Sequence, residues 1–559
     1  MIESIKLLAG SSPEKNPLVV ELAPITIFVG PNYSGKSKVL SEISHACNYG
    51  ARNIERSVLD DVTFTRFEYE KAVKIEESLR IRHPEGAIPQ QGNSFYYFNG
   101  RNIGQASQSY ISESLQDPNG DKRTTFAGYY MNHRTKVLGG YDRIALGSND
   151  QPMGDLQKPP ENTFRRLFDD DELRAHFSKL IYKAFGRHLV TDPTFPGQIR
   201  LRLSPTPPPS PEIERGLSKE SVEFHSAATM VAHTSDGAKA FIGILAEIIA
   251  GKPDVVLMDE PEAFLHPSLA NLLGLEVAQS VASADKRLIA STHSPQFLMG
   301  CIQSGVPLNV IRLTYRDGVA TARLLPSVEL TRLMRDPLLR STSIIDALFY
   351  ESVVVTEADS DRAFYQEINT RLRAANPPRG VSNCLFVNAQ NKHTIPTILE
   401  PLRNLGIPAA AIYDIDFVGD GGGVATKFLR SSGIPALSRD GLNAQRRAVF
   451  DALKSKNQKF NAHGGIQLLD THEANAANDF FDHLASYGAF IVRNGALESW
   501  LSNHGVGGHG PGWLIQMFEK MGLDPSTSDY VHPELGDVWE FMDSVASWLT
   551  DPKRKGIPT

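Results

Sequence analysis

Several carboxylates follow runs of apolar residues in the second half of the chain. Glu357 ends the run in "ESVVVTEADSDRAFY", Asp361 comes four positions later, and Asp414 and Asp416 end the run in "PAAAIYDID". Carboxylates held close together raise one another's pKa values, and divalent cations relieve that repulsion. Two Mg²⁺ or Mn²⁺ ions bound by such acids can activate water and stabilise the leaving oxygen in phosphodiester cleavage. We therefore expect these four acids to be metal ligands.

A second candidate site is glycine-rich. The segment "GPNYSGKS", residues 30–37, fits the pattern G-x-x-x-x-G-K-[ST] of a phosphate-binding loop. Glycines let backbone N–H groups surround phosphate oxygens, and the N-terminus of the following helix adds positive charge. Lys36 is expected to reach the β- and γ-phosphates, and the Ser37 hydroxyl to ligate Mg²⁺. The residues expected to bind the nucleotide are Gly30, Asn32, Ser34, Gly35, Lys36 and Ser37.

The segment "DVVLMDEPE" supplies the acids that such a loop needs. Asp259 ends the apolar run and can hold Mg²⁺, and Glu260 is placed to polarise the attacking water. His293, in "STHS", ends the next apolar run and can sense or stabilise the γ-phosphate. Acids and a histidine at strand ends are also common as plain hydrogen-bonding residues. The upstream phosphate loop favours catalytic roles.

The elements around these residues indicate an α/β protein. Residues 25–29 predict a strand buried on both faces, and a helix should begin near Ser37. Two further strands, at 254–260 and 287–294, are separated by a helix, which implies a mainly parallel sheet. Helical patterns also occupy residues 68–81 and 161–185. The segment 204–211, "SPTPPPSP", predicts a stiff, polyproline-like connector or loop.

A second alternating block begins after about residue 340. Strands are expected at 352–357, 384–389 and 408–416, with helices at 361–374 and 394–406 between them. Ligands gather at the carboxyl ends of the strands in an open parallel sheet. The acids that end the first and third strands should therefore meet. Alternation along the third strand would place its two aspartates on the same face.

Length, composition and charge say more about the number of domains and the cellular compartment than about the function. A chain of 559 residues predicts several domains. The three cysteines, Cys47, Cys301 and Cys384, are widely spaced and indicate a reducing compartment. The start "MIESIKLLAG" lacks the pattern of a signal peptide, and no apolar run is long enough for a membrane helix. We expect a cytoplasmic protein without membrane contact. The net charge of −7 leaves nucleic acid open as a partner, because a binding groove needs only local positive charge.

The first block resembles the ATPase heads of the ABC-type group that includes the structural-maintenance and RecF-like proteins. In that group, ATP lies between two heads, and a Ser/Gly signature reaches across from the partner. The segment "TSDGAKAFIGILAEIIAG" occupies the place of the signature, with Ser235 and Gly237 as the expected donors, although it departs from the usual L-S-G-G pattern. The resemblance implies ATP and Mg²⁺ as cofactors and a homodimer or higher homo-oligomer.

The second block resembles the Toprim fold, since a Glu and a later D-x-D end alternate strands of a compact βαβαβ unit. The E-x-x-x-D of Glu357 and Asp361 is similar to its nuclease branch. An ABC-type ATPase followed by Toprim resembles the overcoming-lysogenization-defect (OLD) family of ATP-dependent nucleases, to which the Gabija nuclease subunit is related. We expect an ATPase domain at 1–335, with a helical or dimerisation insertion at about 60–220, and a Toprim nuclease domain with a helical extension at 345–559.

The resemblance implies more site residues in the C-terminal part. Glu498, in "NGALESWL", is the expected further acid. The family has a catalytic lysine there, for which Lys520 is a candidate and Lys392 a substitute. Members often have a Gly-Gly-Lys turn after the second strand, whereas this chain has "NAQNKH".

The leading hypothesis is an ATP-controlled, Mg²⁺- or Mn²⁺-dependent DNA endonuclease of antiphage defence. Family analogy also suggests a separately encoded partner protein. The main alternative is a regulatory ATPase whose Toprim-like domain is inactive and binds nucleic acid or a partner protein. A repair clamp or scaffold would need long coiled-coil arms, for which the sequence has no heptad pattern.

Overall fold

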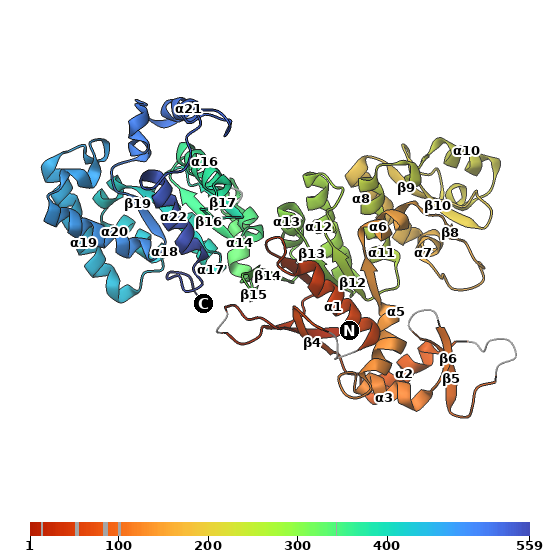
Figure 1. Ribbon diagram of the computed structural model, residues 1–559. Coiled ribbons are helices and arrows are strands. Elements are labelled where there is room, and N and C mark those ends of the chain that lie inside the picture. Colours follow the sequence, from red (N-terminus) through yellow and green to blue (C-terminus); the bar gives the residue numbers. More distant parts are fainter. Residues whose placement is uncertain (13–14, 51–54, 82–87, 99–101, 342–343, 559) are drawn as a thin grey trace. The chain divides into compact units, whose positions relative to one another are not determined.

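The protein is described here from a computed structural model (Figure 1). The described residues are 1–12, 15–50, 55–81, 88–98, 102–341 and 344–558. The chain forms two compact units, residues 1–325 and 326–559. None of the described helices has both the length and the hydrophobicity needed to cross a membrane.

The first unit is built on a six-stranded sheet in the order β15-β14-β3-β13-β12-β7. All neighbouring pairs are parallel except β14 with β15, so the predicted mainly parallel sheet is confirmed. The bounds of these strands are β3 Ile25–Val29, β7 Thr135–Leu138, β12 Val255–Asp259, β13 Arg287–Ser291, β14 Leu308–Arg316 and β15 Val319–Leu324.

Helices and a smaller sheet cover the two faces of this sheet. Helix α1 (Lys36–Tyr49) packs on one face with the three-stranded sheet β2-β1-β4, and Val255 and Leu257 of β12 belong to their shared core. Because side chains alternate along a strand, Val256 and Met258 face the opposite side. The helices that pack together beside β12 and β13 are α6 Gly140–Ser148, α11 Asp236–Ala250, α12 Pro267–Ser283 and α13 Pro295–Gln303.

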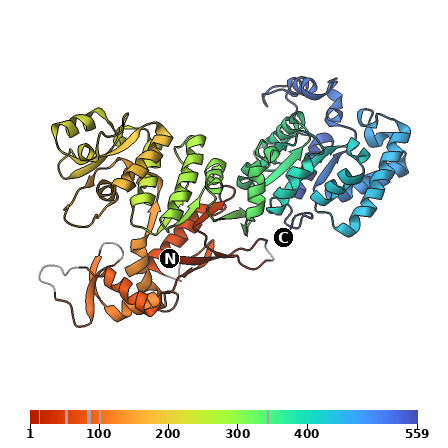
Figure 2. The same ribbon diagram turned by 180° about the vertical axis from the view of Figure 1, so that it is seen from behind.

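The rest of the first unit forms smaller elements, many of them between residues 59 and 230 (Figure 2). The strands are β1 Ile2–Leu7, β2 Val19–Glu21, β4 Leu59–Phe64, β5 Asn93–Phe98, β6 Asn102–Ser107, β8 Gln151–Pro152, β9 His188–Asp192, β10 Gln198–Ser204 and β11 Thr229–Met230. The helices are α2 Tyr69–Leu79, α3 Gln108–Gln116, α4 Arg123–Phe126, η1 Ala127–Met131, α5 Asn132–Arg134, α7 Thr163–Asp169, α8 Asp171–Phe185, α9 Pro211–Arg215, α10 Lys219–Ala227 and η2 Val231–His233.

The second unit is built on a four-stranded sheet in the order β17-β16-β18-β19, and every pair is parallel. Its strands are β16 Ser352–Thr356, β17 Cys384–Asn388, β18 Ala409–Asp414 and β19 Ala489–Val492. The connection from β16 to β17 and the connection from β17 back past β16 to β18 run in opposite directions across the sheet. Because such crossovers are right-handed, their helices α16 (Asp359–Ala374) and α17 (Ile395–Asn404) cover opposite faces. The α/β fold and the strand–helix order predicted for this block are confirmed.

Helices also enclose the core on the α16 side. Trp513 and Trp539 are fully buried there, on α21 and α22. The remaining helices of the unit are α14 Ser327–Arg335, α15 Pro337–Ser341, η3 Ile344–Phe349, η4 Ile415–Gly419, α18 Gly422–Ser431, α19 Ala436–Lys456, η5 Phe460–Ala462, η6 Gly465–Leu468, α20 Thr471–Ala485, η7 Leu497–Ser499, η8 Ser502–His504, α21 Gly510–Met521 and α22 Asp537–Thr550.

Local structure differs from expectation at two places. Strand β18 ends at Asp414, and Asp416 lies in the 3-10 turn η4, so strand alternation does not fix the direction of Asp416. The helical pattern at 161–185 is two helices, because Asn162 and Asp170 each cap a new N-terminus with a side-chain oxygen.

Candidate functional site

The phosphate loop lies between β3 and α1, as its motif predicts. Lys36 is only 4% exposed. Its Nζ donates to the carbonyl oxygens of Gly30 (2.9 Å) and Pro31 (2.6 Å). Burial lowers the pKa of Lys36 to about 8, while the charges of Glu260 and Asp259 act in the opposite direction. The ammonium group is therefore held inside the loop and faces the acids at the end of β12.

The two glycines of the loop are required by its backbone. Gly30 and Gly35 have φ values of 140° and 93°, which other residues rarely adopt. A Cβ at Gly30 would collide with the carbonyl oxygen of Leu313, and one at Gly35 would lie 2.8 Å from Val58 Cγ2. The loop can therefore approach phosphate closely. The Asn32 and Ser37 side chains are exposed at the loop, and Ser34 is buried.

The acids and the histidine converge at the carboxyl ends of β12 and β13. The Ser291 hydroxyl donates to Asp259 Oδ1. His293 Nε2 lies 3.6 Å from Glu260 Oε1. Burial and the charge of Lys36 lower the pKa of His293, although Glu260 and Asp259 oppose the shift. A neutral imidazole beside a half-exposed carboxylate suits the predicted roles of Glu260 and His293 next to a γ-phosphate.

The signature segment begins α11. Ser235 is exposed and caps the helix by accepting a hydrogen bond from the Ala238 N–H through its Oγ, at 3.3 Å. A Cβ at Gly237 would lie 2.5 Å from the Phe264 carbonyl oxygen, so glycine lets the first turn of α11 contact the loop after β12.

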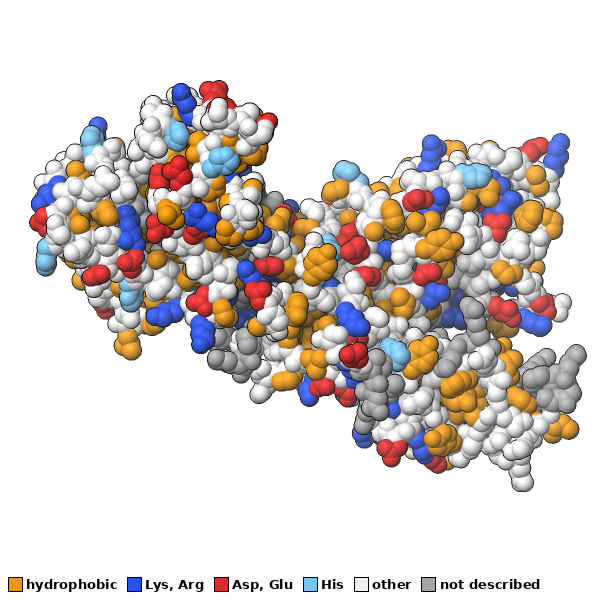
Figure 3. Space-filling model, viewed as in Figure 1, with side chains coloured by type: hydrophobic (Ala, Val, Ile, Leu, Met, Phe, Trp, Pro, Cys, Tyr) orange, Lys and Arg blue, Asp and Glu red, His pale blue; other side chains and the backbone are white. Residues whose placement is uncertain are grey.

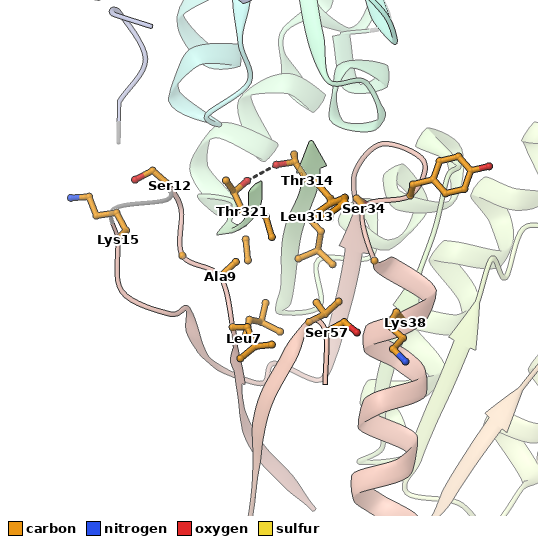
Figure 4. Close-up of a pocket in the computed structure, with 18 residues that line it drawn as sticks. Leu7, Ala9, Ser12, Lys15, Ser34, Lys38, Ser57, Leu313, Thr314 and Thr321 are labelled. Carbon is orange, nitrogen blue, oxygen red and sulfur yellow. Dashed lines mark hydrogen bonds between the residues drawn. The ribbon is translucent and has the colours of Figure 1, made fainter. Parts of the chain in front are cut away.

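A cavity of about 560 Å³ adjoins the phosphate loop (Figure 4). Its walls come from the end of β1, the loop after it, the start of α1, residues 57–58 and the hairpin β14–β15. Thr314 and Thr321 face each other across that hairpin, with their hydroxyl oxygens 2.5 Å apart. The lining residues labelled in Figure 4 are Leu7, Ala9, Ser12, Lys15, Ser34, Lys38, Ser57, Leu313, Thr314 and Thr321. Sequence patterns do not reveal this cavity, because segments far apart in the chain form it.

The acids of the second unit gather at the carboxyl edge of its sheet. Glu357 follows β16, and its Oε1 accepts a hydrogen bond of 3.0 Å from the backbone N–H of Asp414. Burial raises the pKa of Glu357 to about 8, with further contributions from Asp416 and Asp361. Burial also raises the pKa of Asp414, and the charges of Glu357, Asp361, Asp416 and Glu498 add to that rise.

Asp361 and Glu498 complete the group. Asp361 is 8% exposed in the first turn of α16, and burial followed by the charge of Glu498 raises its pKa to about 6. Glu498 Oε1 accepts a hydrogen bond of 2.8 Å from the Gly510 N–H at the start of α21.

Lys392 faces the same edge of the sheet. Its Nζ lies 3.0 Å from Asp416 Oδ2 and 3.4 Å from Asp420 Oδ2. Burial lowers the pKa of Lys392, but the hydrogen bond to Asp416 and the charges of the two aspartates outweigh it, so the net shift is upward. Asp420 was not predicted from the sequence, and its place after η4 carries no motif.

The chemistry of these donors fits a hard divalent cation, which prefers carboxylate oxygens. Asp416 Oδ1 is buried and has no hydrogen-bond partner in the described part of the chain. Within that part, however, no three His, Cys, Asp or Glu side chains are already arranged as a metal-binding group. The donor set is therefore suitable in type, and metal ligation by these acids stays a prediction.

Lys520 is separate from these contacts. It lies exposed on the last turn of α21, and among the described residues no hydrogen bond or ion pair joins it to the acids. The structure brings Lys392 to the site and gives Lys520 no such contact.

Comparisons with known proteins follow the same division. The family described as "AAA domain, putative AbiEii toxin, Type IV TA system" matches residues 155–299. The family described as "Overcoming lysogenization defect protein-like, TOPRIM domain" matches residues 348–416. No curated protein matches the sequence.

Similar solved structures include an Smc head bound to the C-terminal winged-helix domain of ScpA. It is 17% identical, covers 59% of this chain and 99% of its own, and gives a TM-score of 0.33. The SMC head domain from Thermotoga maritima is 12% identical, with 58% and 99% covered and a TM-score of 0.29.

The two family matches, with a mainly parallel sheet in the first unit and a parallel sheet in the second, define the class: a P-loop ATPase domain followed by a Toprim domain. The Toprim domain is of the overcoming-lysogenization-defect type, and the predicted resemblance to the ATPase–Toprim proteins of the OLD family is confirmed.

Proposed function

We propose that the protein is an ATP-hydrolysing, metal-dependent DNA endonuclease of the OLD type. The observation that supports this most strongly is the Glu357 carboxylate, hydrogen-bonded to the Asp414 backbone at the carboxyl edge of a parallel sheet. Asp361, Asp416 and Glu498 contribute to the same electrostatic environment.

The phosphates of ATP would bind at the loop of residues 30–37. Lys36 would exchange its hydrogen bonds to loop carbonyls for the β- and γ-phosphates. Ser37 and Asp259 would hold Mg²⁺, Glu260 would orient and polarise the attacking water, and His293 would contact the γ-phosphate. The adenosine would enter the cavity beside the loop, where Lys15 and Lys38 offer positive charge and Val58 and Leu313 apolar surface.

A second copy of the chain would complete the ATP site. Ser235 is exposed at the N-terminus of α11, where a helix dipole favours anions. We assign Ser235 and Gly237 as donors to the γ-phosphate of ATP bound by the partner subunit, which makes a homodimer the minimal active form. Higher homo-oligomers are compatible with the same contact.

Phosphodiester cleavage would occur at the acids of the second unit. Glu357, Asp361, Asp414, Asp416 and Glu498 are assigned as the residues that hold Mg²⁺ or Mn²⁺. Bound divalent ions supply Lewis-acid activation of water and charge neutralisation. Lys392 would bring positive charge to the scissile phosphate, since its Nζ lies at the same edge of the sheet.

The proposed substrate is DNA, and the proposed role is antiphage defence in the cytoplasm. A separately encoded protein is a further proposed partner. On the face seen in Figure 3, acidic and basic side chains are interspersed, so DNA would contact local basic positions.

Plasmid nicking tests the proposal. Supercoiled plasmid is incubated with the protein and Mn²⁺ or Mg²⁺, with and without ATP. The wild-type protein should nick, Glu357→Ala should not, and Lys36→Ala should change the response to ATP. Asp359→Asn is a matched control, since Asp359 is exposed, is paired with Arg362, and lies two residues from Glu357. No nicking by the wild type in either metal would contradict the proposal.

One observation favours the alternative of a regulatory ATPase with an inactive Toprim domain. Lys392 is engaged with Asp416 and Asp420, and Lys520 has no contact with the acids among the described residues. This alternative predicts ATP hydrolysis and DNA binding without nicking in any divalent metal.

A further inference from the structure

Arg143 contacts the catalytic end of β12 from a helix that no motif singles out. It lies in α6, and its side chain is 2% exposed. Its Nη1 donates to the carbonyl oxygens of Asp259, at 3.1 Å, and Glu260, at 2.7 Å. Helix α6 precedes residues 155–299, which the ATPase family match covers. A single buried guanidinium group therefore holds the backbone of both acids of the ATP site.

The backbone of Glu260 needs this support. Its φ of 50° places a residue with a side chain in the left-handed region, which costs free energy unless its surroundings hold it. The Glu260 N–H donates to the Ser291 carbonyl oxygen at 2.9 Å. The Glu260 carbonyl oxygen accepts from the Ala263 N–H at 3.0 Å and from Arg143. These bonds fix the direction in which the Glu260 side chain leaves the strand.

Helix α6 is also joined closely to α11, the helix that begins with Ser235. A Cβ on Gly243 of α11 would collide with the carbonyl oxygen of Arg143, and a Cβ on Gly147 of α6 would collide with that of Lys239. The two helices therefore touch through their backbones, with no side chain between them to absorb a displacement. A shift of α11 would carry Arg143 with it.

We propose that Arg143 is a positioning residue for ATP hydrolysis, which fixes the Glu260 backbone and couples it to the helix that carries Ser235. The inference rests on the proposed role of Glu260 in activating water. A partner subunit's nucleotide held at the N-terminus of α11 would thereby bias the geometry of this subunit's own Glu260. The guanidinium group acts through the two backbone carbonyl oxygens that it binds.

The alternative is a buried arginine that only stabilises the fold. Removing such a residue would lower the melting temperature and weaken ATP binding together with hydrolysis. A positioning residue acts on the chemical step, because misplacement of a catalytic group by about 1 Å can cost about 10²-fold in rate. A loss of kcat much larger than the loss of ATP affinity would indicate a positioning role, and equal losses would indicate a purely structural one.

The experiment compares Arg143→Met and Arg143→Lys in the full chain. ATP hydrolysis at saturating ATP gives kcat, binding of a fluorescent ATP analogue gives affinity, and thermal melting reports folding. Arg143→Met should lose about 10²-fold in kcat, with affinity within about twofold of wild type. Arg143→Lys keeps the charge but not the planar donor geometry, and should lose about tenfold. It provides the same comparison if Arg143→Met does not fold.

Arg166→Met is the matched control. Arg166 also donates from its guanidinium group to a backbone carbonyl, that of Gly251, 3.3 Å away at the opposite end of α11. The kcat of Arg166→Met should equal that of the wild type. Melting temperature alone does not distinguish these variants, so kcat decides the outcome.

A double variant tests whether Arg143 acts through Glu260. Adding Arg143→Met to Glu260→Gln should lower kcat no further than Glu260→Gln alone, because the carboxylate to be positioned is already gone. The inference would be overturned if the double variant lost much more kcat than Glu260→Gln alone. It would also be overturned if the kcat of Arg143→Met stayed within about twofold of wild type, or if Arg143→Met lost as much ATP affinity as kcat. If Glu260→Gln keeps the wild-type kcat, the proposed role of Glu260 is wrong and the inference falls with it.

Discussion

The Glu357 carboxylate accepts a hydrogen bond of 3.0 Å from the backbone N–H of Asp414, the last residue of the neighbouring strand. This bond links the ends of β16 and β18 through a side chain that is itself a candidate metal ligand. Burial favours the neutral form of Glu357, whereas the Asp414 N–H and Lys392 favour the carboxylate. A bound divalent cation would favour the carboxylate further. The Glu357 carboxylate has therefore lost much of its contact with water and gained a hydrogen bond from the Asp414 N–H and the nearby charge of Lys392. A metal-binding acid needs such groups around it, because they favour its charged form.

Replacing Glu357 with glutamine should weaken metal binding without unfolding the second unit. The amide oxygen can still accept from the Asp414 N–H, but the negative charge that attracts the cation is lost. Mn²⁺ affinity, measured by isothermal titration calorimetry, should fall at least about tenfold. Nicking should fall with it.

Asp359→Asn serves as the control for that loss of charge. It removes one carboxylate two positions away, in a side chain that is exposed and paired with Arg362. Equal Mn²⁺ affinities for Glu357→Gln and Asp359→Asn would remove Glu357 from the metal site.

Replacing Lys392 with methionine should lower the free energy of unfolding and increase the part of it that a bound divalent cation restores. The change removes the positive charge beside Asp416 and Asp420 while it keeps the apolar stem. Since Asp416 is more than a third exposed, the loss of stability should be modest, about 1 kcal/mol. Mn²⁺ should raise the melting temperature of Lys392→Met more than that of the wild type.

Lys427→Met is the matched control for this cation effect. Lys427 belongs to the same unit, and its Nζ donates to the uncharged Thr397 Oγ1 at 2.7 Å. Mn²⁺ should stabilise Lys427→Met and the wild type equally. If Mn²⁺ does not distinguish Lys392→Met from these two proteins, Lys392 is not a neutralising cation of the site.

The strands that carry the sites could be predicted because they are continuous apolar runs. Residues 25–29 form a strand with the predicted bounds, 255–259 form a strand within the predicted 254–260, and 352–356 form the strand that precedes Glu357. Such runs are buried on both faces of a parallel sheet, and the end of each run marks the position of a polar side chain. The approach of Glu357 to Asp414 follows from that topology alone.

Other features depend on contacts that no local pattern encodes. The turn η4 breaks the alternation expected to place Asp416, so its contact with Lys392 was not predicted. Arg143 reaches Glu260 across 117 positions of the chain. The cavity beside the phosphate loop combines the ends of the first unit's sequence. These arrangements depend on contacts between segments that lie far apart in the sequence.

Replacing Lys36 with methionine should abolish tight ATP binding and leave the fold intact. The ammonium group is buried and bound to loop carbonyls, and an apolar chain of similar length fits the same space. Loss of a charged contact to the phosphates should cost about 2–5 kcal/mol of ATP affinity, measured with a fluorescent analogue.

Lys38→Met is the control, because Lys38 is half-exposed on the same helix and pairs with Glu42 at 3.9 Å. Its ATP affinity should fall by much less than that of Lys36→Met. Comparable losses would show that net charge near the loop, and not the position of Lys36, governs binding.

His293 should titrate below the ordinary histidine pKa of 6.5. Burial and the charge of Lys36 disfavour the imidazolium, and together they outweigh Glu260, 3.6 Å away. Because the folded protein holds this proton less tightly than the unfolded chain, His293 lowers stability as the pH falls below about 6.5, and the loss is complete below the folded pKa. Above that window His293 is neutral in both states and contributes no pH dependence.

The measurement is an NMR titration of protein labelled with ¹³C in its histidine rings. The signal absent from His293→Gln identifies the residue, and its midpoint should lie below 6.5. In Lys36→Met the midpoint should rise, because a positive charge that opposes protonation has been removed. A midpoint at or above 6.5 in the wild type would mean that Glu260 and Asp259 outweigh burial and Lys36. A midpoint that Lys36→Met leaves unchanged would mean that the charge of Lys36 does not act on the imidazole.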